Sequence, residues 1–443
     1  MATDGAALAE EAVELALRGG AEQADAYYSA GSSDSVSFDN NRLAQISSGS
    51  SRGIGVRVLQ GGRVGFSSTS LLDRLPDTVD AALAAARLTT PQEAAFELPG
   101  EARGSDLVDA GVDGIQVDEL VDLGRHAVET LRQVADGVLA GAGLGRYRSH
   151  VELANSRGLR AGYSRSGWYV SFIAQRVEGT SIVHCYDGAA SNHRDIDSAA
   201  VLAGVTEKLL GSLKEGRLEA GHRPVLFTPA ALSSLLAAVR MGLSGAAVHR
   251  QTSPLAGRLG EPVLSEKLTL HDDLRPESGR AGAPFDDEGL PADLRTPIEA
   301  GVLRGYNCDL RYGARLGLPA GRASRAGYAS MPHPGSGNQL LEPGERALAE
   351  LMSEAEGGLL VDSLLGMHGS NLMNGDFSAN VGLGFAIGRG GETLYRVKDA
   401  AIAGNVYDLL GPKLVGLSRE RRRGAAGTEV LPWALIGDVP LAG

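Results

Sequence analysis

Histidine, cysteine and carboxylate residues are the side chains of this sequence that could hold a metal or catalyse hydrolysis. The nine histidines never fall into an H-E-x-x-H or H-E-x-x-x-H pattern, which would place two imidazoles and a carboxylate on one helix. The nearest approach to a ligand group is His184 beside Cys185, with His193 further along. This group lies in a stretch that alternates like a hairpin, which favours an incidental pairing. The sequence therefore predicts no metal and no other cofactor.

Two glycine patterns invite a catalytic or nucleotide-binding interpretation. Residues 49–53 read G-S-S-R-G and match the nucleophile elbow, but that motif needs a helix after the serine and a strand is predicted here. We therefore interpret residues 49–53 as a turn. Gly382, Gly384 and Gly388 approximate a dinucleotide fingerprint, yet the third glycine comes one residue too late. No nucleotide site is expected.

Two acidic clusters, at residues 271–273 and 286–289, are the remaining candidates for acid and base catalysis. Paired carboxylates can divide these roles when their environments separate their pKa values. Aspartate and glutamate before glycine also build turns by accepting backbone N–H bonds, and we interpret both clusters in that way. Cys308 lies in a strand-like stretch and is interpreted as a buried core thiol. The sequence thus predicts no catalytic residue.

Charge and composition exclude several classes of partner. The chain has 443 residues with 42 lysines and arginines against 54 acids, a net charge of −12. Such a surface repels phosphate, which argues against nucleic acid or membrane as the main partner. The basic run at residues 419–423 is an exception that we interpret as a solvated loop or helix end. Only two cysteines, and an N-terminal segment unlike a secretory signal, favour a cytoplasmic location.

Hydrophobic periodicity predicts helices and short strands that do not alternate regularly. This pattern indicates an α+β fold in two layers and not a doubly wound α/β fold. A charged, glycine-containing stretch at residues 215–223 marks the main boundary, giving domains 1–218 and 219–443. A small antiparallel sheet is expected at residues 26–70, with a two-residue hairpin turn at Gly61-Gly62. Long hairpins are expected at residues 147–187, and helices at about 8–16, 76–88, 117–134, 196–213 and 229–243.

Several segments, taken in order, carry a resemblance to a known family. They are G-L-S-G at 242–245, F-D-D-E-G at 285–289, I-E-A-G-V-L at 298–303, G-D-F-S at 375–378, I-A-G-N at 402–405 and, in the first half, the pair 53–58 and 62–66. Together they resemble the TldD/PmbA family of metallopeptidases, also called the TldD/TldE family. The resemblance implies a two-domain fold with an N-terminal α/β sandwich-like domain and a β-rich C-terminal domain.

The metal motif of the catalytic members is absent. In TldD-type chains the helix before the G-L-x-G element carries H-E-x-x-x-H, and a later cysteine completes the metal site. Counting back from Gly242, these three positions are Leu236, Ala237 and Met241, and residues 424–426 hold no cysteine. The chain is therefore closest to the PmbA/TldE-type branch, which lacks the metal motif.

The resemblance leaves two functions open. One is a PmbA/TldE-like subunit that pairs with a metal-bearing TldD-like subunit, or with itself as a homodimer built from the C-terminal half, to process or degrade peptides. The alternative is a stand-alone amide hydrolase with a rebuilt site, acting in a peptide or small-molecule biosynthetic pathway. The expected substrate groove includes Leu236, Ala237 and Met241, with His249 and His368 as its polar residues.

Overall fold

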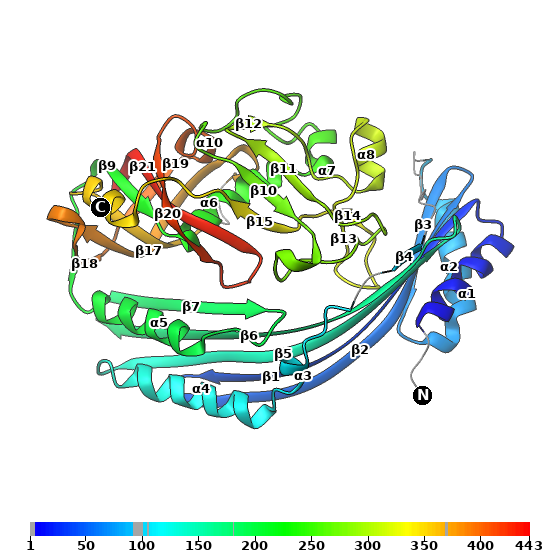
Figure 1. Cartoon of the computed structure of the whole chain (residues 1–443), viewed down its shortest axis with the longest axis horizontal. Coiled ribbons are helices and arrows are strands. Elements are labelled where there is room, and N and C mark those ends of the chain that lie inside the picture. The colour runs from blue at the N-terminus through cyan, green and yellow to red at the C-terminus, as the bar shows by residue number, and fades with distance from the viewer. Residues whose placement is uncertain (1–4, 92–100, 104–105, 180, 368–370) are drawn as a thin grey trace.

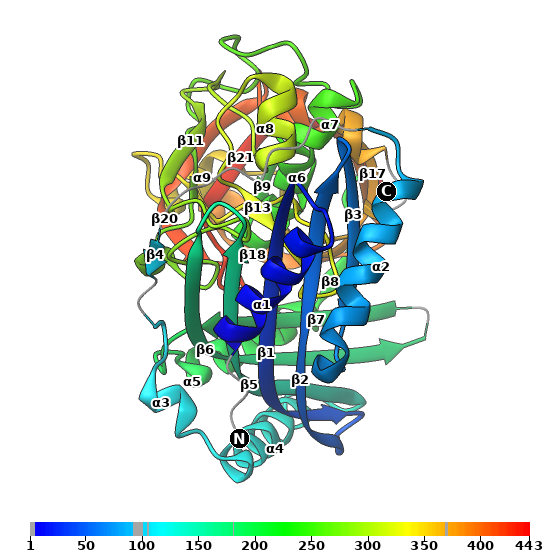
Figure 2. The same cartoon turned by 90° about the vertical axis from the view of Figure 1, so that its right-hand side faces the viewer.

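The computed structural model describes residues 5–91, 101–103, 106–179, 181–367 and 371–443. Its two domains pack against each other along an extended contact. Figure 1 shows the N-terminal sheet curving beneath and beside the C-terminal domain, and Figure 2 shows helices α1 (Gly5–Arg18) and α2 (Leu75–Leu88) in front of that sheet. The α+β class and the two-domain architecture expected from the sequence are confirmed.

The N-terminal sheet consists of long antiparallel strands. Over the described residues its order is β3-β2-β1-β5-β6-β4, with β7 pairing with β6 and only β4 running parallel to its neighbour. The predicted turn at Gly61-Gly62 is confirmed, since both glycines have positive φ and join Gln60 to Arg63. The strands are β1 (Gln23–Asp39), β2 (Arg42–Gln60), β3 (Arg63–Thr69), β4 (Glu101–Arg103), β5 (Val138–Asn155), β6 (Arg160–Glu178) and β7 (Ser181–Ser191).

Two sequence expectations for this sheet were wrong. The strands are not short, because β1 and β2 have 17 and 19 residues and continue through serine-rich sequence of weak strand propensity. Residues 49–53 are therefore not a turn but lie inside β2. The turn that the sequence analysis missed is Asn40-Asn41, whose φ angles of 49° and 66° give the left-handed pair of a tight hairpin.

Helices cover both ends of one sheet face, and none of the described helices covers its middle. Alternate residues of β1 point to this face, and those at its start share a buried cluster with α1 and α2. Val36 and Phe38 at its end share a cluster with α4 (Val117–Arg132) instead. Helix α5 (Ser198–Ser212) packs against β6 and β7 and shares a cluster with Leu383 and Phe385 of the C-terminal domain. The four-residue α3 (Ala110–Asp113) lies beside β5 and β6.

The C-terminal domain is built around a twelve-stranded sheet, counted over the described residues. Helix α6 (Pro229–Gly242) packs against β21 and β16, and it begins where the Thr228 hydroxyl accepts from the N–H of Ala231. The strands are β8 (Glu215–Gly216), β9 (Gly221–Phe227), β10 (Leu270–Asp273), β11 (Leu294–Glu299), β12 (Val302–Leu303), β15 (Asn338–Leu341), β16 (Leu359–Leu365), β17 (Asp376–Ile387), β18 (Thr393–Val397), β19 (Ala401–Asn405), β20 (Leu414–Arg423) and β21 (Glu429–Ala442).

Four short α-helices and a separate strand pair also belong to the described part of this domain. The strand pair is β13 (Ala323–Ser324) with β14 (His333–Pro334). The helices are α7 (Gly245–His249), α8 (Leu310–Leu316), α9 (Leu348–Glu354) and α10 (Val406–Leu409).

Two further local expectations need correction. The basic run 419–423 is not a loop or helix end, since it forms the exposed second half of β20 and pairs with β21. Cys308 is fully buried as expected, but it lies just before α8 and not in a strand. The expected helices are all present within a few residues of their predicted ends. The boundary between residues 218 and 219 stays a prediction.

Candidate functional site

A cleft between the two domains is the candidate site. It has a volume of about 490 Å³ and lies where α5 and β7 face the start of α6 and the β20–β21 hairpin. We call it the interdomain cleft. Its lining includes Tyr186, Asp187, Glu207, Lys208, Thr228, Pro229, Ala230, Ser233, Leu360, Asp362, Phe385, Arg422, Arg423, Gly424, Ala425, Ala426, Thr428, Glu429 and Trp433.

Four charged side chains form a linked group in the cleft. Lys208 Nζ lies 3.0 Å from an Asp362 oxygen and 3.7 Å from an Asp187 oxygen, and it donates to the Tyr186 carbonyl. Arg422 contacts the same Asp187 oxygen at 2.5 Å. Residues from α5, β7, β16 and β20 are thereby held together, although Arg422 keeps 42% of its side chain exposed. The group combines charges of both signs in a partly wet space.

A second ion pair ties α6 to the hairpin beside the cleft. Arg240 Nη1 lies 2.5 Å from Glu429 Oε1, and Arg240 also donates to the Ser233 carbonyl. Ser233 and Glu429 both line the cleft. The face of α6 that carries Ser233 therefore borders the cavity.

The three positions expected in a substrate groove point in different directions. Leu236 is 1% exposed and belongs to the C-terminal core. Ala237 is half-buried and lies one turn after Ser233, which places it on the same helical face. Met241 is 40% exposed at the end of α6. Successive positions differ by about 100° on a helix, so Leu236 can pack inward while Ala237 and Met241 turn outward.

The two histidines proposed for the groove are not brought into the cleft. His249 is exposed at the end of α7, with its ring centroid 5.7 Å from that of Tyr312. His368 lies outside the residues that the structure describes. The described lining residues of the cleft therefore include no histidine.

The donor set at the positions expected to match the family's metal motif does not fit a metal. Leucine and alanine offer no ligand atom, and the thioether of Met241 is a soft, weak ligand unsuited to zinc. Residues 424–426 do border the cleft, but they are glycine and alanine. Among the described residues, no group of three histidine, cysteine or carboxylate side chains is arranged to hold a metal ion.

Cysteine chemistry is also disfavoured. Burial raises the pKa of Cys185 to about 11 and that of Cys308 to about 11. Both side chains are thus neutral thiols near pH 7, and the thiolate is the form that attacks carbon or binds metal. His184 is exposed and Cys185 is buried, as adjacent strand positions require.

At the opposite end of the domain contact, the polar groups are sealed from solvent. Arg57 of β2 contacts Asp25 of β1 and, at 2.8 Å, Glu288 of the C-terminal domain. Arg325 lies 3.4 Å from the same Asp25 carboxylate. All four residues are more than 90% buried. We call these residues the buried ion network. The sequence analysis missed it, although Glu288 lies in the cluster interpreted as a turn.

The two acidic clusters combine turn and buried roles. Asp286 accepts backbone N–H bonds from Glu288 and Leu290, as a turn aspartate does. Burial nevertheless raises its pKa to about 7. Asp272 does not form a turn; it lies in β10, fully buried against Arg322 at 2.6 Å. The turn interpretation therefore holds for Asp286 and for Asp273, which accepts from the N–H of Arg275, and it is wrong for Asp272 and Glu288.

Comparison with protein families supplies the class of protein. The model described as PmbA/TldA metallopeptidase C-terminal domain matches residues 220–443, and the model described as PmbA/TldA metallopeptidase domain 1 matches residues 24–86. The chain belongs to the TldD/PmbA family, as its segments led us to expect.

Individual relatives agree with this assignment. The chain is 27% identical over 418 residues to a metalloprotease PmbA homolog of Haemophilus influenzae, covering 90% of this chain and 88% of that protein. It is 26% identical over 415 residues to metalloprotease PmbA of Escherichia coli O157:H7, covering 90% and 89%. Within the described residues, no helix has the length and apolar character needed to cross a membrane.

Solved structures share the fold over the whole chain. TldE from Thermococcus kodakarensis superposes with a TM-score of 0.89 at 23% identity, covering 98% of this chain and 100% of that one. A putative modulator of DNA gyrase from Bacteroides thetaiotaomicron gives 0.86 at 22% identity, with both chains fully covered.

Proposed function

We propose that this protein is a PmbA/TldE-like subunit of a peptidase, which binds peptide and pairs with a metal-bearing TldD-like chain that performs the hydrolysis. The observation that carries the proposal is the set of family metal positions, occupied by Leu236, Ala237, Met241 and the glycine and alanine of residues 424–426. With Leu236 in the core, a ligand there would require repacking of α6. The role therefore fits a chain that supports catalysis without performing it.

The relatives support a peptidase context. Two relatives that each match 90% of this chain are named metalloprotease PmbA or its homolog, and a metalloprotease TldD homolog of Haemophilus influenzae matches over 174 residues at 28% identity. The fold of TldE from Thermococcus kodakarensis supports the subunit type. A cytoplasmic location, the division at residues 218 and 219, and dimerisation through the C-terminal half belong to the same proposal.

The interdomain cleft supplies the peptide-binding surface in this proposal. Lys208 and Arg422 can contact peptide carbonyls or carboxylates, while Asp187, Asp362 and Glu207 can contact peptide N–H groups. The cleft is bordered by α6 and by residues 424–426, so a peptide held there would lie close to the family's catalytic positions. It would reach a partner's metal only if the two chains face each other across this cleft.

The test is a reconstitution with a TldD-type chain from the same genome. We expect the two chains to copurify and to cleave a short unstructured peptide in a chelator-sensitive way, whereas this chain alone releases no product. The Arg422→Ala variant should lower cleavage by the pair about tenfold, the cost of one charge-assisted contact. The matched control is Arg419→Ala, because Arg419 lies on the same strand and contacts the Glu345 carbonyl outside the cleft.

Two results would contradict the proposal. Metal-independent amide hydrolysis by the isolated chain would favour the stand-alone hydrolase with a rebuilt site. Failure of the two chains to associate at micromolar concentration would contradict the proposed pairing.

A further inference from the structure

Strand β2 leaves most of one edge without a partner. Strand β3 pairs with it only between Ile54 and Gln60. From Arg42 to Arg52, β2 pairs with β1 on one side, and no strand of the described residues covers the other side. All eleven residues of this stretch are exposed. In Figure 2, β3 accompanies the upper part of β2 while the lower part continues towards the turn with β1.

From Gln45 to Ser51 this edge lacks the features that usually prevent strand pairing, and a register shift lies beyond it, between Leu43 and Gln45. Edge strands are commonly protected by lysine, proline, inward-pointing charges or bulges. From Gln45 to Ser51 the sequence is Q-I-S-S-G-S-S, without proline or charge, and its pairing with β1 is regular. The small side chains leave the backbone N–H and C=O groups accessible. An incoming strand would continue the line of β3.

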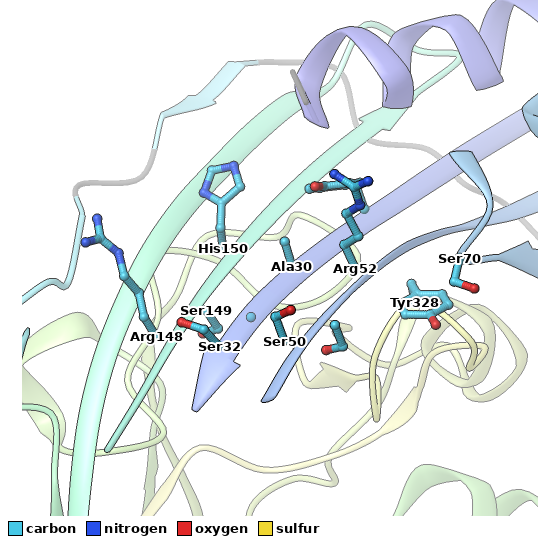
Figure 3. A pocket seen from close by; sticks show the side chains of 12 residues that line it. Ala30, Ser32, Ser50, Arg52, Ser70, Arg148, Ser149, His150 and Tyr328 are labelled. Carbon is cyan, nitrogen blue, oxygen red and sulfur yellow. The ribbon is translucent and has the colours of Figure 1, made fainter. Parts of the chain in front are cut away.

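A groove adjoins the upper end of this edge, where the chain leaves β3. It has a volume of about 780 Å³, and its lining includes Ser50 and Ser70 together with Tyr328 of the C-terminal domain. Figure 3 shows Ser50 and Arg52 on β2 and His150 on β5, with Ala30 of β1 between Arg52 and His150, around this groove. Such a cavity next to an open edge can receive side chains of a bound strand.

The groove is basic in an acidic protein. Arg52, Arg148 and His150 line it, and no aspartate or glutamate is found among its described lining residues. Nearby acids offset part of this charge, since Arg148 lies 2.9 Å from Asp113 and His150 2.9 Å from Glu152. Arg148 still has guanidinium N–H groups for a second acceptor, whereas both ring nitrogens of His150 already have a neighbour, since Nδ1 lies 3.1 Å from Ser164 Oγ.

We propose that the free edge of β2 at residues 42–52 binds an extended peptide with acidic side chains, which adds to the sheet as a strand and places a carboxylate in the adjoining groove. Main-chain hydrogen bonds would supply affinity with little dependence on sequence, and the basic groove would supply preference. A second copy of this chain fits less well. Residues 42–52 contain two arginines and no acid, so self-pairing would bring only like charges to the contact.

The probe is a fluorescein-labelled peptide that alternates threonine and glutamate over the length of the exposed stretch, titrated into the full chain by fluorescence anisotropy. We expect saturable binding that weakens with added salt. A threonine and lysine peptide of the same length should not bind. A proline-interrupted version of the acidic peptide should also fail, because proline cannot complete the ladder.

Two proline variants locate the contact. Successive strand residues direct their N–H groups to opposite edges, so one of Ile46→Pro and Ser47→Pro removes a free N–H and the other disrupts pairing with β1. The variant with an unchanged unfolding midpoint should bind the acidic peptide about tenfold more weakly. Arg52→Glu should weaken binding to a similar degree. Arg389→Glu, an exposed charge reversal on the C-terminal domain, should bind normally.

Equal binding of the acidic and basic peptides, or unchanged binding by both proline variants, would overturn the proposal. So would a dimer that dissociates in the proline variant with an unchanged midpoint, because the edge would then belong to a second copy. The assay needs neither a partner subunit nor hydrolysis. Its failure would therefore leave the proposed subunit function untouched.

Discussion

The two ends of the domain contact use the same side-chain chemistry in opposite ways. At the buried ion network, Arg57 bridges Asp25 and Glu288 with side chains no more than 5% exposed. At the interdomain cleft, Lys208 bridges Asp187 and Asp362 around a cavity, and Arg422 remains 42% exposed. Breaking a sealed network leaves an unpaired buried charge, whereas solvent can replace a partner lost from the cleft. The first end fixes the domains, and the second remains available to a ligand.

Removal of Arg57 should have the largest effect. Among the described residues, Arg57→Ala leaves Asp25 with the longer contact to Arg325 as its remaining ion pair, and it leaves Glu288 buried without its arginine. We expect a loss of about 3 to 5 kcal/mol in the free energy of unfolding, measured by urea denaturation. The exposed Arg52→Ala on the same strand should change it by less than about 0.5 kcal/mol. Equal effects of the two variants would remove the distinction between the two ends.

Asp309 should make the stability of the region around the buried ion network sensitive to pH. Burial, with a smaller contribution from Glu288, raises its pKa from 3.8 to about 6. The pKa of Asp309 is higher in the folded than in the unfolded state. Below about pH 4 the residue is protonated in both states and does not affect the free energy of unfolding. As pH rises from about 4 to about 6, Asp309 progressively lowers the free energy of unfolding.

The matching variant is Asp309→Asn, which can still accept the N-capping bond that Tyr312 N donates to this residue. Between about pH 4 and pH 7, the variant should lose up to about 3 kcal/mol less of its free energy of unfolding than the wild type loses. Unfolding curves at these pH values provide the measurement. Parallel profiles for variant and wild type would show that Asp309 does not titrate in this range.

A substitution at Gly55 tests how closely the two domains approach each other near the buried ion network. A Cβ at Gly55 would lie 2.1 Å from the backbone oxygen of Tyr328, so the loop that carries Tyr328 would have to move away. Gly55→Ala should destabilise the protein by about 2 kcal/mol. Gly49→Ala on the same strand is the matched control, because its Cβ meets nothing within 4 Å. A neutral Gly55→Ala would indicate a loosely held contact.

Loss of Arg422 should have the smallest effect on stability. Asp187 would keep its contact with Lys208, and water can solvate the opened position. We expect a change below about 1 kcal/mol in the free energy of unfolding. The same variant is expected to impair peptide cleavage by the reconstituted pair. A loss as large as that of Arg57→Ala would show that the cleft is structural.

The sequence was sufficient for the helices and the family, because both depend on local patterns. Apolar spacing located α6, and the count back from Gly242 identified Leu236, Ala237 and Met241. It could not show that Leu236 packs in the core while Met241 is exposed, since that depends on what covers each face of the helix. The prediction of short strands was wrong for a similar reason. The serines of β2 have low strand propensity, but they form a strand because β1 provides their hydrogen-bonding partners.

The polar contacts between the domains were beyond local patterns. Arg57 and Glu288 are 231 residues apart, and Asp187 and Arg422 are 235 apart. Neither member of such a pair is distinguishable in sequence from a surface charge. The cluster at residues 286–289 did stand out as dense in acids, but its buried partners come from another domain. Correlated substitutions at the two positions across related sequences are the signal that would identify such contacts.

The position of β21 sets an order for synthesis and folding. Strand β21 pairs with β9, β15, β19 and β20, and the ribosome makes it after all four. The N-terminal sheet needs only strands from the first half of the chain and can assemble early, while the second sheet must wait for its central strand. We therefore expect the nascent chain to hold a formed first sheet while the edges of the second sheet stay unpaired until β21 emerges.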